Sequence, residues 1–285
     1  MVGIVIVNYN LDDDVLKLVE SLIEEGQKNI LVVDNYNLQK PDIFNDLAVS
    51  YLCTGENLGY GKGNNVGFDY FQAKNINRVL VLNPDVVCLP KPVLSSLESQ
   101  LDIHLDVAAV SPLVLTLGRD SDDLNTARAQ IQVRRILSSF EMFICSTFLR
   151  KVFRFVMKRY VYSELKGKGG IHIVDSINGA CFLIDLSRIN FRFSEEMFLY
   201  FEEVYMGYLF KEVGLKFILH GDIFVRHSQG ATTGSNNRSY SVLRERQKLS
   251  SELLVYTHFK VFNYFTLVIV KYLRLFEIVI RRCLR

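Results

Sequence analysis

Short apolar runs alternate with helix-like segments through the first 110 residues. Runs of this length are typical of strands covered on both faces of a sheet, and the segments between them repeat apolar residues at helical spacing. The predicted strands are Gly3–Val7, Ile30–Val33, Val49–Cys53, Val79–Leu82 and Val107–Val110. The predicted helices are Asp12–Glu25, Asn64–Ala73 and Lys91–Leu101. This alternation predicts an α/β fold, with a mostly parallel central sheet and helices on both faces.

Polar residues follow the ends of four predicted strands. Asn8 and Asn10 follow the first strand, Asp34 the second, Asn57 the third and Asp85 the fourth. In an open α/β sheet, ligands bind beyond the carboxyl ends of the strands. The sequence therefore predicts one polar rim, built from four strand ends, as the binding site.

The second half of the chain has a less regular pattern. Its predicted elements are a polar loop over Arg119–Gln130, a helical, apolar and basic stretch over Ile136–Tyr162, a strand over Asn178–Ile184, a helix within Phe198–Val213 that opens with Glu202 and Glu203, short strands over Phe217–Leu219 and Ile223–Val225, a polar loop over His227–Tyr240, and helices from Val242 nearly to the end. We therefore predict one large domain over residues 1–240 and a helical segment over residues 241–285.

Charge is distributed unevenly along the chain. Residues 1–125 carry 8 basic and 18 acidic side chains, whereas residues 126–285 carry 25 basic and 13 acidic ones. The asymmetry indicates that the second half meets an anionic partner, such as lipid, a phosphorylated substrate or nucleic acid, or that the two halves attract each other. No nucleic-acid-binding motif accompanies the basic residues, so we expect no nucleic-acid partner.

The cysteines and the N-terminus indicate the compartment. The five cysteines are scattered, odd in number and without metal-ligand spacing, which is typical of reduced thiols in a cytoplasmic protein. The first residues show neither a basic leader nor a small-residue cleavage site, so no signal peptide is expected.

The last helix is predicted to be amphipathic. At 100° per residue, one face carries the polar and charged residues Lys260, Asn263, Thr266, Lys271, Arg274, Glu277, Arg281, Arg282 and Arg285. The opposite face carries Phe265, Val268, Ile269, Tyr272, Phe276, Val279 and Ile280. Its longest uncharged run, Val261–Val270, is shorter than the roughly 20 residues of a spanning helix. The pattern favours a helix lying in an anionic membrane surface, or a helix packed on protein, and the basic, aromatic segment Arg150–Tyr160 resembles it.

Six motifs, taken in order, carry a family resemblance. They are Ile4–Asn10, Val32–Asn35, Asn57–Gly67, Leu82–Asp85, Asn178–Phe182 and Phe198–Glu203. With them the chain resembles a family 2 inverting glycosyltransferase of the GT-A fold, and within that family the bacterial rhamnosyltransferase-like branch that builds O-antigens and other surface polysaccharides. The resemblance spans roughly residues 3–230. It implies a nucleotide-binding half over residues 1–110 and an acceptor-binding half over 111–240.

The resemblance assigns a nucleotide-sugar site and a metal. The nucleotide-binding residues it implies are Asn8, Tyr9, Asn10, Asp34, Asn57, Gly59, Asn64, Asn65 and Asn83. Asp34 would accept a hydrogen bond from a pyrimidine N–H, and Asp85, with His227 nearby, would hold Mg²⁺ or Mn²⁺. The family's metal motif is often Asp-X-Asp, and Asn83 replaces its first carboxylate here. The same residues also fit plain structural roles: a turn at Asn83–Asp85, a cap at Asp34, and a flexible glycine connection after Asn57.

Glu202 and Glu203 stand where the family carries Glu-Asp, whose Asp is the catalytic base. Inverting transfer needs a carboxylate that removes the proton of the acceptor hydroxyl, so Glu203 is the implied base and Glu202 its neighbour. At a helix N-terminus we expect a lowered pKa that keeps Glu203 ionised. The alternative is a solvated helix start, where Glu is common.

The implied activity is transfer of a sugar from a nucleoside-diphosphate donor, dTDP-rhamnose or a UDP-hexose, to a lipid-linked glycan. We expect the enzyme at the cytoplasmic face of the plasma membrane. Two alternatives remain. The replacements at Asn83 and Glu203 favour a catalytically degenerate, membrane-associated binding protein. A nucleotidyltransferase is disfavoured, because Asn8–Asp12 is not the basic, glycine-rich loop that such enzymes carry after the first strand.

Overall fold

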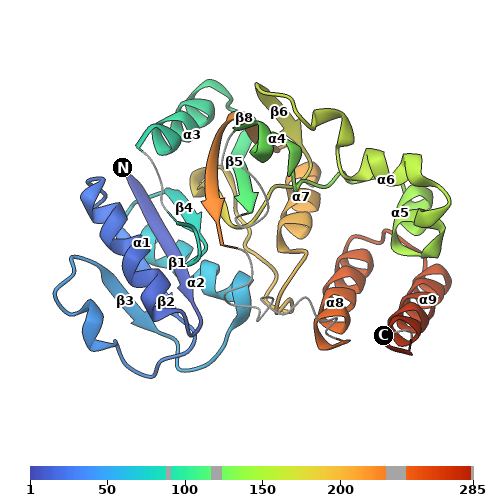
Figure 1. The fold of residues 1–285 in the computed structure, drawn as a ribbon, viewed down its shortest axis with the longest axis horizontal. Helices are drawn as coiled ribbons and strands as arrows, with labels where there is room; N and C mark the ends of the chain where they lie inside the picture. The colour runs from blue at the N-terminus through green and yellow to red at the C-terminus, as the bar shows by residue number, and fades with distance from the viewer. Residues whose placement is uncertain (88–90, 117–123, 229–241, 284–285) are drawn as a thin grey trace.

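A computed structural model shows an α/β domain built on one twisted sheet, with further helices packed at one side (Figure 1). The structure describes residues 1–87, 91–116, 124–228 and 242–283. The strands described there are β1 (Val2–Asn8), β2 (Ile30–Asp34), β3 (Ser50–Cys53), β4 (Arg78–Leu82), β5 (Val107–Thr116), β6 (Ile171–Val174), β7 (Cys181–Asp185) and β8 (Lys216–His227). They form an eight-stranded sheet in the order β3-β2-β1-β4-β7-β5-β8-β6. The predicted α/β class with a mostly parallel central sheet is confirmed.

The sheet has a parallel half and a mixed half. Strands β3, β2, β1 and β4 are parallel neighbours, and Asn8 lies opposite Asp34 at the carboxyl ends of β1 and β2. Strand β7 runs antiparallel between β4 and β5, β8 is parallel to β5, and β6 closes the edge antiparallel to β8. The short strands predicted over Phe217–Leu219 and Ile223–Val225 are one strand, β8, whose pairing shifts register opposite Pro112 and Leu113. Edge strand β6 was not predicted.

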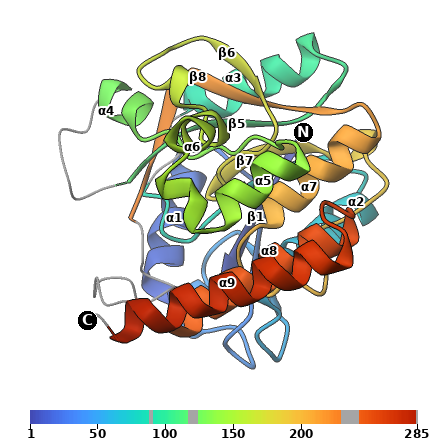
Figure 2. The same ribbon diagram turned by 90° about the vertical axis from the view of Figure 1, so that its right-hand side faces the viewer.

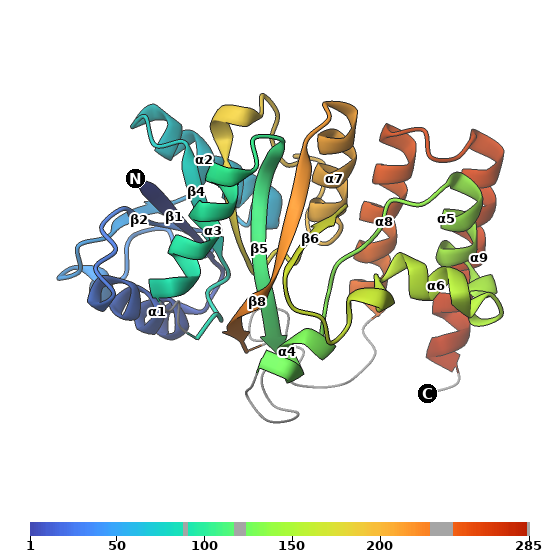
Figure 3. The ribbon, with the colours of Figure 1, turned by 90° about the horizontal axis from the view of Figure 1, so that it is seen from above.

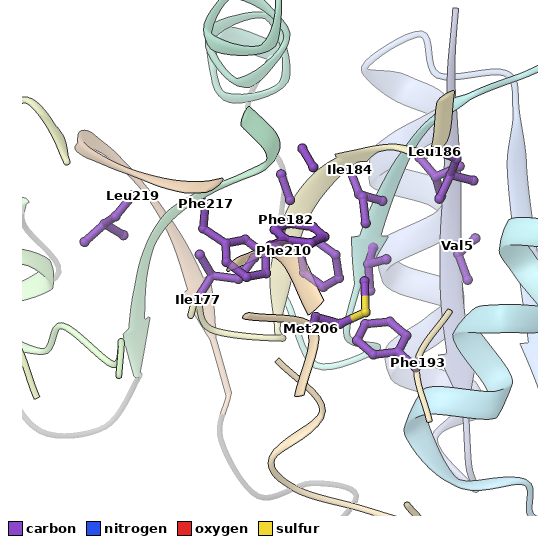
Figure 4. Close-up of a cluster of buried hydrophobic side chains, with 14 of the residues drawn as sticks. Val5, Ile177, Phe182, Ile184, Leu186, Phe193, Met206, Phe210, Phe217 and Leu219 are labelled. Atoms are coloured by element: carbon purple, nitrogen blue, oxygen red, sulfur yellow. The ribbon is translucent and has the colours of Figure 1, made fainter. Parts of the chain in front are cut away.

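The helices cover both faces of the sheet and extend beyond it. They are α1 (Asp12–Glu24), α2 (Gly59–Ala73), α3 (Lys91–Ile103), α4 (Leu124–Ala129), α5 (Ser139–Ser146), α6 (Arg154–Tyr160), α7 (Glu202–Glu212), α8 (Val242–His258) and α9 (Tyr264–Cys283). One core lies between the sheet and α2 with α7, where aromatic side chains and Met206 meet in the close-up of Figure 4. The other core lies between the sheet and α1 with α3.

Helix α2 begins at Gly59, so the glycine-rich segment is helical, and the predicted helix start at Asn64 is five residues too late. The reason is close packing on the sheet. A methyl group added to Gly63 would lie 2.7 Å from Val7 Cγ1, and one added to Gly67 would overlap Val5. The glycines therefore let α2 approach β1 more closely than any other residue would allow.

Two predictions for the middle of the chain are corrected. The polar segment Arg119–Gln130 contains helix α4, although its first residues lie outside the described part of the chain. The stretch Ile136–Tyr162 is not one helix but α5, a 3-10 turn at Phe148–Lys151, and α6. Helix α5 starts at a capping box, in which Ser138 and Glu141 each bond the other's backbone N–H.

The C-terminal helices α8 and α9 pack with α5 beside the sheet domain (Figure 3). Buried Tyr256, Phe262 and Val270 form the centre of this third core, and the Tyr256 hydroxyl lies 2.6 Å from Ser146 Oγ of α5. The predicted helical character after Val242 is confirmed over the described residues. The part of the predicted loop His227–Tyr240 that follows Ser228 lies outside the described residues, and so does Arg285. Among the residues that the structure describes, no helix is long and apolar enough to cross a membrane.

Candidate active site

The carboxyl ends of β1 and β2 meet in a network of buried polar side chains. Asn8 donates to Asp12 Oδ1 at 2.7 Å and accepts from the Leu11 N–H, so it holds the start of α1. The Asp34 carboxylate is fully buried and accepts from the Tyr36 N–H at 2.8 Å, from Asn37 and from the Tyr51 hydroxyl. Asp34 therefore shapes the turn after β2, and its predicted contact with a nucleotide base stays a prediction.

Two tyrosines stand exposed above this network. The rings of Tyr9 and Tyr36 meet edge to face, with centroids 5.5 Å apart, and both are accessible to solvent. Asn10 beside them adopts a left-handed backbone, with φ of 56°. Exposed aromatic rings at a strand-end rim can stack on a flat ligand. Sequence reasoning named Tyr9 but missed Tyr36, although its position two residues after Asp34 was a usable signal.

The polar residues at the start of α2 are largely engaged within the protein. Asn57 accepts from the Gly59 N–H at 3.0 Å, and Gly59 has φ of 79°. Asn65 exchanges two hydrogen bonds with the backbone of Phe193, which leaves it a structural role. Asn64 differs, since its buried Oδ1 has no hydrogen-bond partner among the described residues.

Asp85, Asn83 and His227 come together where β4 and β8 end. His227 Nε2 lies 2.8 Å from Asp85 Oδ1 and 3.5 Å from Asn83 Nδ2. The two elements are joined by backbone: the Ser228 N–H donates to the Asp85 carbonyl at 2.8 Å. The sequence prediction placed Asp85 and His227 at one site, and the structure brings them into contact.

This pair fits a divalent cation. Asp85 is buried, and apart from the contact with His227 its Oδ1 makes no hydrogen bond within the part of the chain that the structure describes. A carboxylate oxygen and an imidazole nitrogen at this separation can both point at one ion. Over the same residues, no group of three or more His, Cys, Asp or Glu gathers that could hold a metal. Mg²⁺ and Mn²⁺ can be held by only one or two protein side chains where the phosphates of a substrate complete the coordination shell.

Glu202 and Glu203 begin α7 after a strained stretch of backbone. Tyr200 and Phe201 both have positive φ, 73° and 69°, which non-glycine residues adopt at a cost. The strain turns the chain so that Glu202 is buried, with Oε1 lacking a hydrogen bond to any described residue. Glu203 lines a small cavity among apolar side chains. Backbone strain of this kind is most often kept where a site needs it.

The carboxyl groups of this pair hold their protons more tightly than free glutamate. Burial raises the pKa of Glu203 to about 7. Burial, and then the charge of Glu203, raise the pKa of Glu202 well above its ordinary value. The expected lowering by the helix N-terminus is therefore wrong, because removal from water outweighs the helix dipole here. Of the two groups, Glu203 titrates near neutral pH.

The segment from Asn178 to Ala180 links the glutamates to the Asp85 cluster. Asn83 donates its N–H to the Ala180 carbonyl at 2.9 Å. The Glu203 carboxylate lies so close to Gly179 that a methyl group there would overlap it, and the Tyr60 hydroxyl donates to the Gly179 carbonyl at 2.6 Å. One short segment therefore holds the carboxylate pair and the Asp85 cluster in a fixed relation, and sequence reasoning gave Gly179 no such role.

Comparison with known proteins identifies the class. In the solved structures, the chain is similar to the mannosyltransferase PcManGT of Pyrobaculum calidifontis in complex with GDP-Man and Mn²⁺, with 13% identity, a TM-score of 0.54 and coverage of 90% of this chain and 63% of that one. It is also similar to GalNAc-T7 with UDP, GalNAc and Mn²⁺, at 13% identity, a TM-score of 0.58 and coverage of 90% and 47%. A third similar structure is S. aureus TarS 1–349, at 13% identity, a TM-score of 0.51 and coverage of 90% and 64%. The sheet and its flanking helices are thus those of GT-A glycosyltransferases.

The family follows from the sequence. Residues 3–157 match the family described as Glycosyl transferase family 2, and the chain belongs to that family. A stretch of 88 residues is 36% identical to the low-salt glycan biosynthesis hexosyltransferase Agl10 of Haloferax volcanii, covering 30% of this chain and 27% of that protein. The chain thus spans less than two thirds of the length of each protein named here.

Proposed function

We propose that this protein transfers a hexose or deoxyhexose from a nucleoside diphosphate to a hydroxyl of a lipid-linked glycan, with inversion at the anomeric carbon. The proposal rests on one observation: the segment Asn178–Ala180 contacts two different clusters, the Asp85 cluster on one side and the glutamates on the other. Asp85 and His227 form a cation site suited to a diphosphate, and Glu203, on the other side of Gly179, has a pKa of about 7.

The donor would lie along the strand-end rim. Its base would stack on Tyr9 and Tyr36 beside Asn8, Asn10 and Asp34, and a pyrimidine fits the acceptor character of Asp34. dTDP-rhamnose and UDP-hexoses are the donors we favour, as the rhamnosyltransferase-like sequence motifs imply. The diphosphate would meet the metal that Asp85 and His227 hold, with Asn83 alongside. Such a cation neutralises charge on the departing diphosphate.

Glu203 would act as the general base. Its carboxylate takes the proton from the acceptor hydroxyl while that oxygen bonds to the anomeric carbon, and the bond from that carbon to the diphosphate oxygen breaks with its electron pair leaving on the nucleotide. A base works best with a pKa near the working pH, and burial gives Glu203 such a value. Burial raises the pKa of Glu202 well above its ordinary value, which disfavours a second negative charge beside Glu203.

The acceptor and the location belong to the same proposal. A lipid-linked glycan presents its growing end at a membrane, and the aromatic and basic C-terminal segment is suited to hold the enzyme there. We place the enzyme on the cytoplasmic face, peripheral to the membrane, as part of surface polysaccharide synthesis of the O-antigen type.

Thermal shift with a panel of sugar nucleotides tests the donor side. We expect one pyrimidine sugar nucleotide to raise the melting temperature in the presence of Mn²⁺ and not in EDTA. Asp85→Asn should abolish most of that shift, while Asp42→Asn, on an exposed 3-10 turn, should retain it. Equal shifts with and without metal, or in Asp85→Asn, would remove the cation from the proposal.

A further inference from the structure

Helix α9 turns its aromatic face to solvent. The exposed apolar side chains on it are Tyr264, Phe265, Tyr272, Phe276, Val279 and Ile280. Phe265 is 74% exposed and Phe276 63%, values that a helix packed by its apolar face would not show. The residues therefore form a continuous apolar strip with no described part of the chain covering it.

Ion pairs hold the opposite face of α9 against the protein. Arg150, from the turn before α6, forms an ion pair with Glu277, and Arg274 lies 3.7 Å from Glu252 of α8. Val270 and Ile278, on the same side of the helix, are buried. Arg274 and Glu277 of the charged face thus point toward the protein. The sequence left open whether the helix lies in a membrane surface or packs on protein. The apolar face is the one left free.

A second exposed apolar segment lies beside α9. Phe148, Val152, Phe153 and Phe155 are exposed around the 3-10 turn and the start of α6. The ion pair from Arg150 to Glu277 holds this segment against α9, and Figure 2 shows α5, α6 and α9 on the same side of the molecule. Of the seven exposed phenylalanines among the described residues, six lie in α5, α6, α9 or the turn between α5 and α6, so the clustering is specific to this side.

The unpaired charges on this side are basic. Lys151, Arg154, Lys158, Lys271 and Arg282 are exposed and make no ion pair with another described residue. The acidic residues of α5, α6 and α9 are Glu141 and Glu277, and both are engaged by arginines. An apolar strip bordered by free lysine and arginine matches a bilayer surface, where aromatic rings enter the headgroup region and the basic groups meet anionic lipid.

We infer that α9 and the segment from Phe148 to Phe155 form one membrane-anchoring surface, whose partner is the anionic headgroup layer of a lipid bilayer. This inference gives the proposed membrane location a structural basis. It concerns binding alone, so its test uses no donor and no glycan acceptor. A failure here leaves glycosyl transfer intact, and a failure of glycosyl transfer leaves the anchoring surface intact.

Vesicle flotation of the full chain tests the surface. We expect the protein to float with vesicles of phosphatidylcholine and phosphatidylglycerol at low salt, and less with phosphatidylcholine alone or at high salt. The double variant Phe265→Ser with Phe276→Ser should lose at least about tenfold in partitioning. The matched control is Leu38→Ser with Leu105→Ser, two leucines at least 80% exposed on the sheet domain, which should float like the parent.

A charge series separates lipid binding from apolar contact with protein. Each substitution Lys151→Gln and Lys158→Gln should weaken binding to the anionic vesicles about fivefold. Lys17→Gln with Lys28→Gln, exposed lysines of the sheet domain, serve as controls without effect. Unchanged melting curves confirm folding of all variants. The inference is overturned if the parent stays unbound with anionic vesicles at low salt, or if light scattering shows that this face instead joins two copies of the chain.

Discussion

Replacing Glu203 by glutamine should make the protein more stable at alkaline pH while it loses activity. The carboxylate is held in a place where its charge is costly, since burial raises its pKa from 4.5 to about 7. In the unfolded chain the same group ionises freely. The folded state therefore binds the proton more tightly, and the stability that this gives is fully present below the unfolded pKa and is lost as the pH rises through the folded one.

The size of the effect follows from the two pKa values. With 4.5 in the unfolded state and about 7 in the folded state, the free energy of unfolding should fall by about 2–3 kcal/mol between pH 5 and pH 8 on account of this group. Glutamine has no proton to lose, so Glu203→Gln should lack this part of the decline.

Urea unfolding of the parent and of Glu203→Gln, at pH 5 and at pH 8, measures the difference directly. We expect the variant to gain on the parent as the pH rises, and Glu195→Gln, on an exposed loop, to follow the parent. Parallel pH dependences of the parent and Glu203→Gln would show that Glu203 is ionised as freely in the fold as in water. The reasoning that makes it a near-neutral base would then fail.

Three further changes test the packing and the rim. Gly67→Ala should destabilise the fold by about 1 kcal/mol or more, because the overlap with Val5 outweighs the better helix propensity of alanine, and calorimetric melting measures it. Gly179→Ala should lower turnover about tenfold or more at nearly unchanged stability, since the methyl displaces the Glu203 carboxylate. Tyr36→Ala should weaken donor binding by about 1 kcal/mol, read by titration calorimetry, and an unchanged affinity would exclude this ring from the base site.

Much of the sheet was predictable because its signal is local. A buried strand appears in the sequence as a short apolar run, and the polar residue that follows the run lies at the rim of the sheet, as Asn8 and Asp34 do. Strand β6 has no such signal, because it is an edge strand whose Ile171 and Ile173 are exposed. The glycine-rich start of α2 was predicted as a connection, because the contacts that need these glycines are with residues far away in the sequence: Gly63 packs on Val7 of β1, and Gly61 packs on Phe193.

The site was predictable in its residues but not in its chemistry. The family resemblance pointed to Asp85, His227 and Glu203. The structure brings Asp85 and His227 into contact, although His227, at the end of β8, is far from Asp85 in the sequence. The direction of the Glu203 pKa shift depends on what surrounds the carboxylate in space, and a helix-start pattern misstates it. Helix α9 shows the same limit of sequence prediction. The periodicity of the sequence defines a polar and an apolar face, but only the packing of the helix decides which face is exposed to solvent, and the ion pair of Arg150 with Glu277 fixes that packing.

The central claim is sugar transfer with Glu203 as base, and release of nucleoside diphosphate under saturating donor, Mn²⁺ and acceptor lipid tests it most directly. We predict that Glu203→Gln lowers the rate by about 10²–10⁴-fold with donor affinity unchanged. Glu202→Gln should be milder, because burial raises the pKa of Glu202 well above its ordinary value and so disfavours its ionised form. An inactive Glu202→Gln beside an active Glu203→Gln would move the base to its neighbour. A parent enzyme that binds donor and releases no diphosphate would contradict the account and establish a binding protein.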